Sequence, residues 1–109
     1  MAEKVILDNF FENDLLDGSS LNIGLAVSVF NYEITNKMYN HAYDSLVEHK
    51  VDKNNIKRVD VPGAFELPLI CKKMAESNKY DSIIAIGVVI KGDTDHYEFV
   101  ANNASNGIA

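Results

Sequence analysis

The alternation of short apolar runs with amphipathic stretches constrains the fold most strongly. Runs with the length and apolar content of β-strands occur at 21–30, 56–61 and 82–86. The stretches that repeat apolar residues at helical spacing are about 33–49, 65–76 and the residues after 95. Strands that alternate with helices through short connections form parallel sheets flanked by helices. The sequence therefore predicts a three-layer α/β/α fold.

The polarity of each run predicts its place in the sheet. The run 56–61 carries charged residues, which indicates a strand near the sheet edge. The run 82–86 is almost wholly apolar, as expected for a strand covered on both faces, and we expect it to continue toward Ile90. Residues 1–20 are expected to form an N-terminal arm, either loosely held or an edge segment that docks on a neighbour. Residues 21–109 are expected to form the α/β domain.

The helical stretches also predict which side chains face the sheet. In the first, the expected inner residues are Ile34, Met38, Ala42 and Leu46, with Tyr39, Tyr43 and Val47 beside them. In the second, they are Leu67, Ile70, Cys71 and Met74. Pro68 fits this helix only in or near its first turn, where a missing N–H costs little.

Composition limits the function classes. A length of 109 residues suits one domain, and the net charge of −6 argues against a general nucleic-acid binder. The single cysteine, Cys71, excludes an internal disulfide and fits a reducing compartment. We found no signal-like or membrane-length apolar run, so the expectation is a cytoplasmic protein that is not bound to a membrane.

The stretch 87–98 is the candidate site, because it links a strand end to a helix start through a Gly-containing turn. Ligands of α/β sheets bind at the carboxyl ends of strands, and helix N-termini favour anions. His96 lies in the expected first helical turn, where the dipole favours a neutral imidazole that accepts protons. From the residues alone, a solvated histidine and a metal site made by Asp93, Asp95, His96 and Glu98 are the alternatives.

Three stretches of the chain resemble the lumazine synthase family of riboflavin biosynthesis. They are Val29–Asn31 with Ile34 and Thr35, then Val61–Pro68, and finally Gly87–Tyr97. The order and spacing of these stretches make the resemblance specific, and it extends from Leu21 to Ala109.

The resemblance implies a flavodoxin-like fold and a reaction that needs no cofactor. Members of the family condense 5-amino-6-(D-ribitylamino)uracil with 3,4-dihydroxy-2-butanone 4-phosphate and release phosphate. They assemble as pentamers or larger shells of pentamers, with active sites between adjacent subunits. They are also longer at the C-terminus, where a further strand and helices, an aromatic residue and an arginine serve the site. We therefore expect this chain to correspond to the first two-thirds of such a subunit.

The resemblance also implies a role for each matching residue. His96 is the expected proton-transfer residue. Phe30 is expected to stack on the pyrimidine and Asn31 to add a polar contact, and the backbone of Val88, Val89 and Ile90 to recognise the uracil edge. Ala64, Phe65 and Glu66 are expected to line the ribityl chain. The implied phosphate-binding residues are Gly92, Asp93 and Thr94.

Two positions depart from the family pattern. Asp93 stands where a small neutral residue is usual, and a carboxylate repels phosphate. Lys91 stands where arginine is common, which keeps the charge but loses the bidentate geometry. Without the resemblance, Phe30 reads as a core residue, Asn31 as a turn residue and Glu66 as an ordinary first-turn glutamate. The alternative functions are a non-catalytic flavin-binding or ribityl-binding module and a shell-forming subunit.

Overall fold

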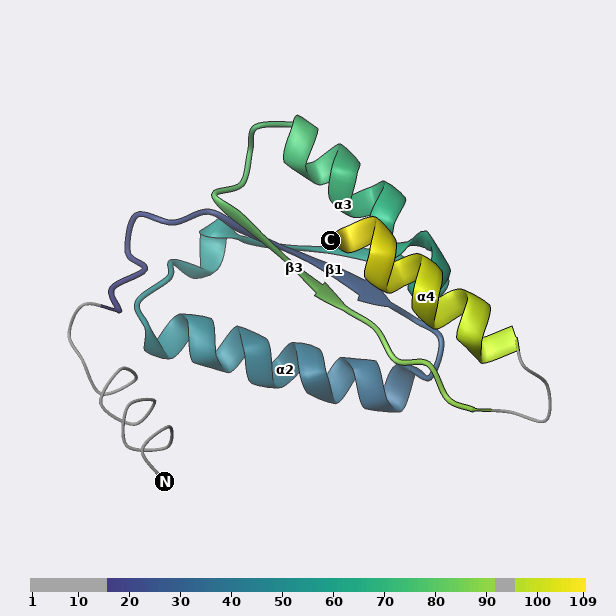
Figure 1. The fold of residues 1–109 in the computed structure, drawn as a ribbon. Helices are drawn as coiled ribbons and strands as arrows, with labels where there is room; N and C mark the ends of the chain where they lie inside the picture. Colours follow the sequence, from purple (N-terminus) through teal and green to yellow (C-terminus); the bar gives the residue numbers. More distant parts are fainter. Residues whose placement is uncertain (1–15, 92–95) are drawn as a thin grey trace, which may run out of the picture.

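A single parallel sheet organises the chain. The computed structural model describes residues 16–91 and 96–109. In these ranges the strands are β1 (Ile23–Ser28), β2 (Ile56–Val61) and β3 (Ser82–Ile86), arranged in the order β2-β1-β3 (Figure 1). Both pairings are parallel, with Ile23 opposite Ile56 on one side and Ser82 on the other. The carboxyl ends of the strands therefore meet at one edge.

Helices cover both faces of this sheet (Figure 1). One face carries α2 (Tyr32–Glu48), and the other carries α3 (Leu67–Glu76) and α4 (His96–Ile108). Two single turns of 3₁₀-helix, η1 (Lys53–Asn55) and η2 (Ala64–Glu66), precede β2 and α3 respectively. This arrangement confirms the predicted three-layer α/β/α fold.

Strand β1 is the centre of the core, because it pairs on both sides and all six of its residues are buried. Leu25 and Val27 belong to the apolar cluster under α2, whereas Ala26 belongs to the cluster under α3. The alternation of side chains across the strand thus joins the two layers of helices to one strand. The predicted edge position of β2 is confirmed, with Lys57 and Asp60 exposed.

One prediction for β3 is wrong: the strand ends at Ile86, so Val88–Ile90 are not strand residues. Ile84 packs on the cluster under α2 and Ile83 on the cluster under α3, as expected for a strand covered on both faces, although only Ile86 of its five residues is fully buried. Within the described ranges, β3 pairs with β1 alone and one of its edges has no strand partner. An apolar, β-branched composition does not distinguish such a strand from a central one, because both pack apolar side chains against helices.

The inner face of α2 also differs from the prediction. Tyr39, Ala42, Tyr43, Leu46 and Val47 pack on the core, but Ile34 and Met38 are each 43% exposed. The fully buried residue of the first turns is Thr35. The apolar stripe of α2 is thus wider than the face that the sheet covers.

Helix α3 agrees with its prediction on the inner side. Leu67, Ile70, Cys71 and Met74 all contribute to the core, and Pro68 lies in the first turn. The preceding residues form η2 rather than the start of the same α-helix. This break fits Pro68, which has no N–H to continue the helical hydrogen bonds. None of the helices in the described part of the chain is long and apolar enough to cross a bilayer.

Candidate functional site

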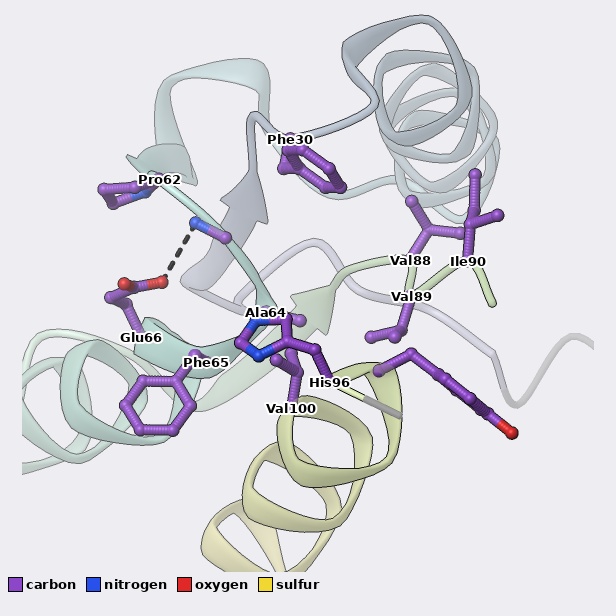
Figure 2. Close-up of a pocket in the computed structure, with 12 residues that line it drawn as sticks. Phe30, Pro62, Ala64, Phe65, Glu66, Val88, Val89, Ile90, His96 and Val100 are labelled. Carbon is purple, nitrogen blue, oxygen red and sulfur yellow. Dashed lines mark hydrogen bonds between the residues drawn. The ribbon is translucent and has the colours of Figure 1, made fainter. Parts of the chain in front are cut away.

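A cavity of about 390 Å³ opens where the carboxyl ends of the strands meet the starts of the helices (Figure 2). Its volume lies in the range of small-molecule pockets. Segments that are distant in the sequence supply its walls. The lining residues are Phe30, Pro62, Gly63, Ala64, Phe65, Glu66, Val88, Val89, Ile90, His96, Tyr97 and Val100.

Backbone hydrogen bonds beyond the end of β1 hold Phe30 at this cavity. The N–H of Val29 donates to the Val61 carbonyl at 2.8 Å, and that of Phe30 donates to the Pro62 carbonyl at 3.0 Å. The main chain of Phe30 is thereby fixed while its side chain remains 64% exposed. The aromatic ring is therefore available to a planar ligand, and Figure 2 shows it across the cavity from the His96 imidazole.

Asn31 is not among the residues that line the cavity. Its backbone is left-handed, with φ 59° and ψ 49°, a region in which asparagine is enriched. The Asn31 carbonyl accepts hydrogen bonds from the N–H groups of Ile34 and Thr35, which begins α2. Within the described ranges, its side-chain Nδ2 is buried without a hydrogen-bond partner. The turn that Asn31 makes separates Phe30 from the helix.

Glu66 lies on the cavity wall formed by η2. Its Oε2 accepts a hydrogen bond from the Gly63 N–H at 3.0 Å, and the Glu66 N–H donates to the Gly63 carbonyl at 3.2 Å (Figure 2). This reciprocal pair fixes the carboxylate at the start of the turn, where backbone N–H groups lack helical partners. Ala64, beside it, is buried and packs in the cluster under α3.

The segment Val88–Ile90 forms another wall without regular secondary structure. Val89 packs against the apolar cluster that also includes Val100 and Ala104, whereas Ile90 is 52% exposed. Because this segment lies outside the sheet ladder, its polar backbone groups need partners from elsewhere, and a ligand is one source.

His96 lies on the cavity at the N-terminal end of α4. Figure 2 shows its imidazole turned toward Ala64, across the cavity from Phe30. The side chain is exposed, so solvent and ligands reach it. Phe30, Glu66 and His96, which come from separate parts of the sequence, therefore border the same space.

Sequence reasoning did not assign Pro62, Gly63 or Val100 to the site and gave Tyr97 no individual role within the candidate stretch 87–98, although all four line the cavity. For Val100 a signal existed, since it lies one helical turn after His96 on the same side of α4. Tyr97 also has Lys91 nearby, with Nζ 5.9 Å from the ring centroid.

The predicted phosphate-binding residues Gly92, Asp93 and Thr94 lie outside the described ranges, as does Asp95. The phosphate assignment and the metal alternative therefore stay predictions.

A comparison with known protein families identifies the chain. Residues 20–109 match the family model described as 6,7-dimethyl-8-ribityllumazine synthase. The chain belongs to this family. The match covers all of the described cavity-lining residues, and the parallel α/β sheet agrees with it. Membership of the lumazine synthase family indicates a function of that type in riboflavin biosynthesis.

Proposed function

We propose that the chain is a lumazine synthase. It condenses 5-amino-6-(D-ribitylamino)uracil with 3,4-dihydroxy-2-butanone 4-phosphate to 6,7-dimethyl-8-ribityllumazine and releases phosphate. The observation that carries this proposal is that an aromatic ring, a carboxylate and an imidazole, from Phe30, Glu66 and His96, border one cavity. These groups match a planar heterocycle, a polyol and a proton transfer respectively.

The pyrimidine lies against Phe30 in this proposal. Offset stacking of aromatic rings contributes about 0.5–1.5 kcal/mol beyond area burial. The backbone of Val88–Ile90 provides hydrogen bonds to the uracil edge, which the irregular conformation of this segment supports. Asn31 remains a proposed polar contact, although its side chain does not line the cavity of the described structure.

The ribityl chain lies along Ala64–Glu66. One oxygen of Glu66 is engaged by the Gly63 N–H, and the carboxylate has further acceptor capacity for polyol hydroxyls. Hydrogen bonds to a charged acceptor are about twice as strong as neutral ones. Glu66 therefore supplies preference for a ribityl chain over a plain ring.

His96 transfers protons. The 5-amino nitrogen attacks the butanone carbonyl carbon, and His96 accepts the amine proton and returns it to the departing hydroxyl, so that an imine and water form. Removal of the C3 proton of the imine then expels phosphate from C4 with the electrons of its C–O bond and leaves a C3=C4 enol. Return of a proton to C4 converts this enol to a ketone. The ribityl-bearing nitrogen attacks that carbonyl, and loss of a second water closes the ring.

The phosphate of the second substrate is assigned to Gly92, Asp93 and Thr94, with N–H groups and the Thr94 hydroxyl as donors. In this assignment Asp93 contributes its N–H rather than its carboxylate, and Lys91 supplies positive charge to the phosphate. We also propose a homo-oligomer, either a pentamer or an assembly of pentamers, with sites between adjacent subunits. The exposed aromatic side chains of Phe30 and Phe65, which line the cavity, support a surface that a neighbour covers.

The test measures turnover and binding together. The protein is incubated with both substrates, and lumazine absorbance and phosphate release are followed, with each substrate omitted in turn as a control. Equal rates for the two products support the proposal. Binding of a ribityl-substituted pyrimidine in preference to a mononucleotide, without turnover, would favour a binding module. Absence of both turnover and ribityl binding would contradict the proposal.

A further inference from the structure

Helix α4 contacts the η2–α3 segment at two points through residues of α4 that do not line the cavity. The Asn103 Nδ2 atom donates a hydrogen bond to the Phe65 carbonyl at 3.1 Å. Four residues further on, Gly107 lies against the ring of Pro68, so closely that a Cβ on Gly107 would stand 2.5 Å from the Cβ of Pro68. The first contact is a specific polar bond, and the second allows the helices to approach.

The sequence explains why the Phe65 carbonyl accepts a bond from another element. In a continuing 3₁₀ turn, the carbonyl of residue 65 would receive the N–H of residue 68. That residue is Pro68, which has no N–H. The Asn103 amide of α4 therefore donates to the Phe65 carbonyl where Pro68 cannot.

We propose that Asn103 is a positioning residue, which sets the wall formed by Ala64–Glu66 relative to His96 on α4. This inference rests on the proposed function. Asn103 follows His96 by about two helical turns and is not among the cavity-lining residues, so it acts through the elements it joins.

The small size of η2 makes such a bond important. With three residues, it has few internal hydrogen bonds to define its orientation. Its Glu66 carboxylate and the His96 imidazole lie on two elements that the Asn103 bond connects directly. Because Asn103 and Phe65 are both exposed, the bond competes with water and contributes little to stability. Its main consequence is therefore the geometry of the cavity.

This role predicts a selective kinetic change. Asn103→Ala removes the donor and lets the Glu66 wall shift away from its ribityl partner. We expect the KM for the ribityl substrate to rise about fivefold, the size expected for one lost hydrogen bond. We expect kcat and the KM for the butanone phosphate to change less than about twofold. A purely structural role would instead lower the thermal midpoint and both specificity constants together.

Matched variants make the test specific. Asn102→Ala changes the same residue type at the neighbouring exposed position of α4, and Asn103→Gln retains an amide donor. The proposal expects both to behave like the wild type, as judged by kinetics and by titration with a ribityl-substituted pyrimidine. If the wild type binds this pyrimidine and Asn103→Ala binds it equally well, or if Asn102→Ala is equally impaired, the positioning role is wrong. A wild type that neither binds the pyrimidine nor turns over would overturn the proposed function, and this inference with it.

Discussion

Gly87 lies directly against Leu67, so that a Cβ at position 87 would stand 2.8 Å from Cδ1 of Leu67 and 3.4 Å from the Cβ of Ala64. This contact joins the segment that follows β3 to the η2–α3 segment at the side of the cavity. Leu67 is only 3% exposed, so its Cδ1 would have to shift within a packed cluster to admit a Cβ. A glycine at this position is thus favoured by close approach, and not by a positive φ angle.

Gly87→Ala should lower the free energy of unfolding by about 1–3 kcal/mol, the usual cost of adding a methyl group to a packed core. Urea denaturation monitored by circular dichroism measures the change. Gly63→Ala is the matched control, since a Cβ there would meet only the Glu66 Oε2 at 3.4 Å and the backbone is extended. Its stability should change by less than about 1 kcal/mol. Equal stability of the two variants would show that Leu67 shifts to accommodate the added methyl group, and would contradict the prediction.

Phe30→Ala should weaken binding of a ribityl-substituted pyrimidine by about 3- to 10-fold, because the stacking surface is lost. The fold should be retained, since the ring is 64% exposed. Fluorescence titration measures the affinity. The control is Phe99→Ala, which removes a more exposed aromatic side chain that does not line the cavity. If Phe30→Ala binds the pyrimidine with unchanged affinity, Phe30 does not stack on it.

Glu66→Gln should remove the charge of this side chain while retaining its hydrogen bond to the Gly63 N–H. The amide oxygen of glutamine still accepts from the Gly63 N–H, so stability should change by less than about 0.5 kcal/mol. Affinity for the ribityl ligand should fall by about 3- to 10-fold, because charge-assisted hydrogen bonds become neutral ones. Isothermal titration calorimetry tests this. A loss of stability without a loss of affinity would indicate that Glu66 only caps the turn.

His96→Ala should slow the condensation without abolishing it. General acid–base catalysis typically contributes about 10²- to 10⁴-fold, and we expect the low end, because holding two reactive substrates together supplies much of the acceleration. Single-turnover rates are the appropriate measurement. His41→Ala, at an exposed position on α2, serves as the control. Single-turnover rates equal to those of the wild type would exclude the proton-transfer role.

Cys71 should react slowly with iodoacetamide in the folded protein. Partial burial raises the pKa of its thiol above the ordinary value of 9.0, so little thiolate is present at neutral pH. The folded state thus holds this proton more tightly than the unfolded state. The associated stability is present below pH 9.0 and is lost as pH rises through the higher folded pKa. Measuring the alkylation rate of Cys71 with and without denaturant tests this shift in pKa. Equal rates in the folded and the unfolded protein would contradict it.

Local patterns in the sequence predicted the elements and their order well. The apolar spacing of the stretch 65–76 identified the inner face of α3 correctly, and Pro68 marked its first turn. Charged residues in β2 indicated its edge position, which the structure confirms. These properties depend on periodicity within a segment, which is why one sequence suffices to read them.

The tertiary structure decided which elements meet. Composition did not show that β1 is the central strand, that β3 ends at Ile86, or that Asn103 of α4 bonds to the Phe65 carbonyl. The motif resemblance assigned Phe30, Glu66 and His96 to one site, and the fold places these distant residues around one cavity. By itself, the sequence determined the local conformations, because backbone geometry and side-chain periodicity act over a few residues. Only packing between distant segments determined edges, strand ends and the cavity, because those depend on partners that no local pattern specifies.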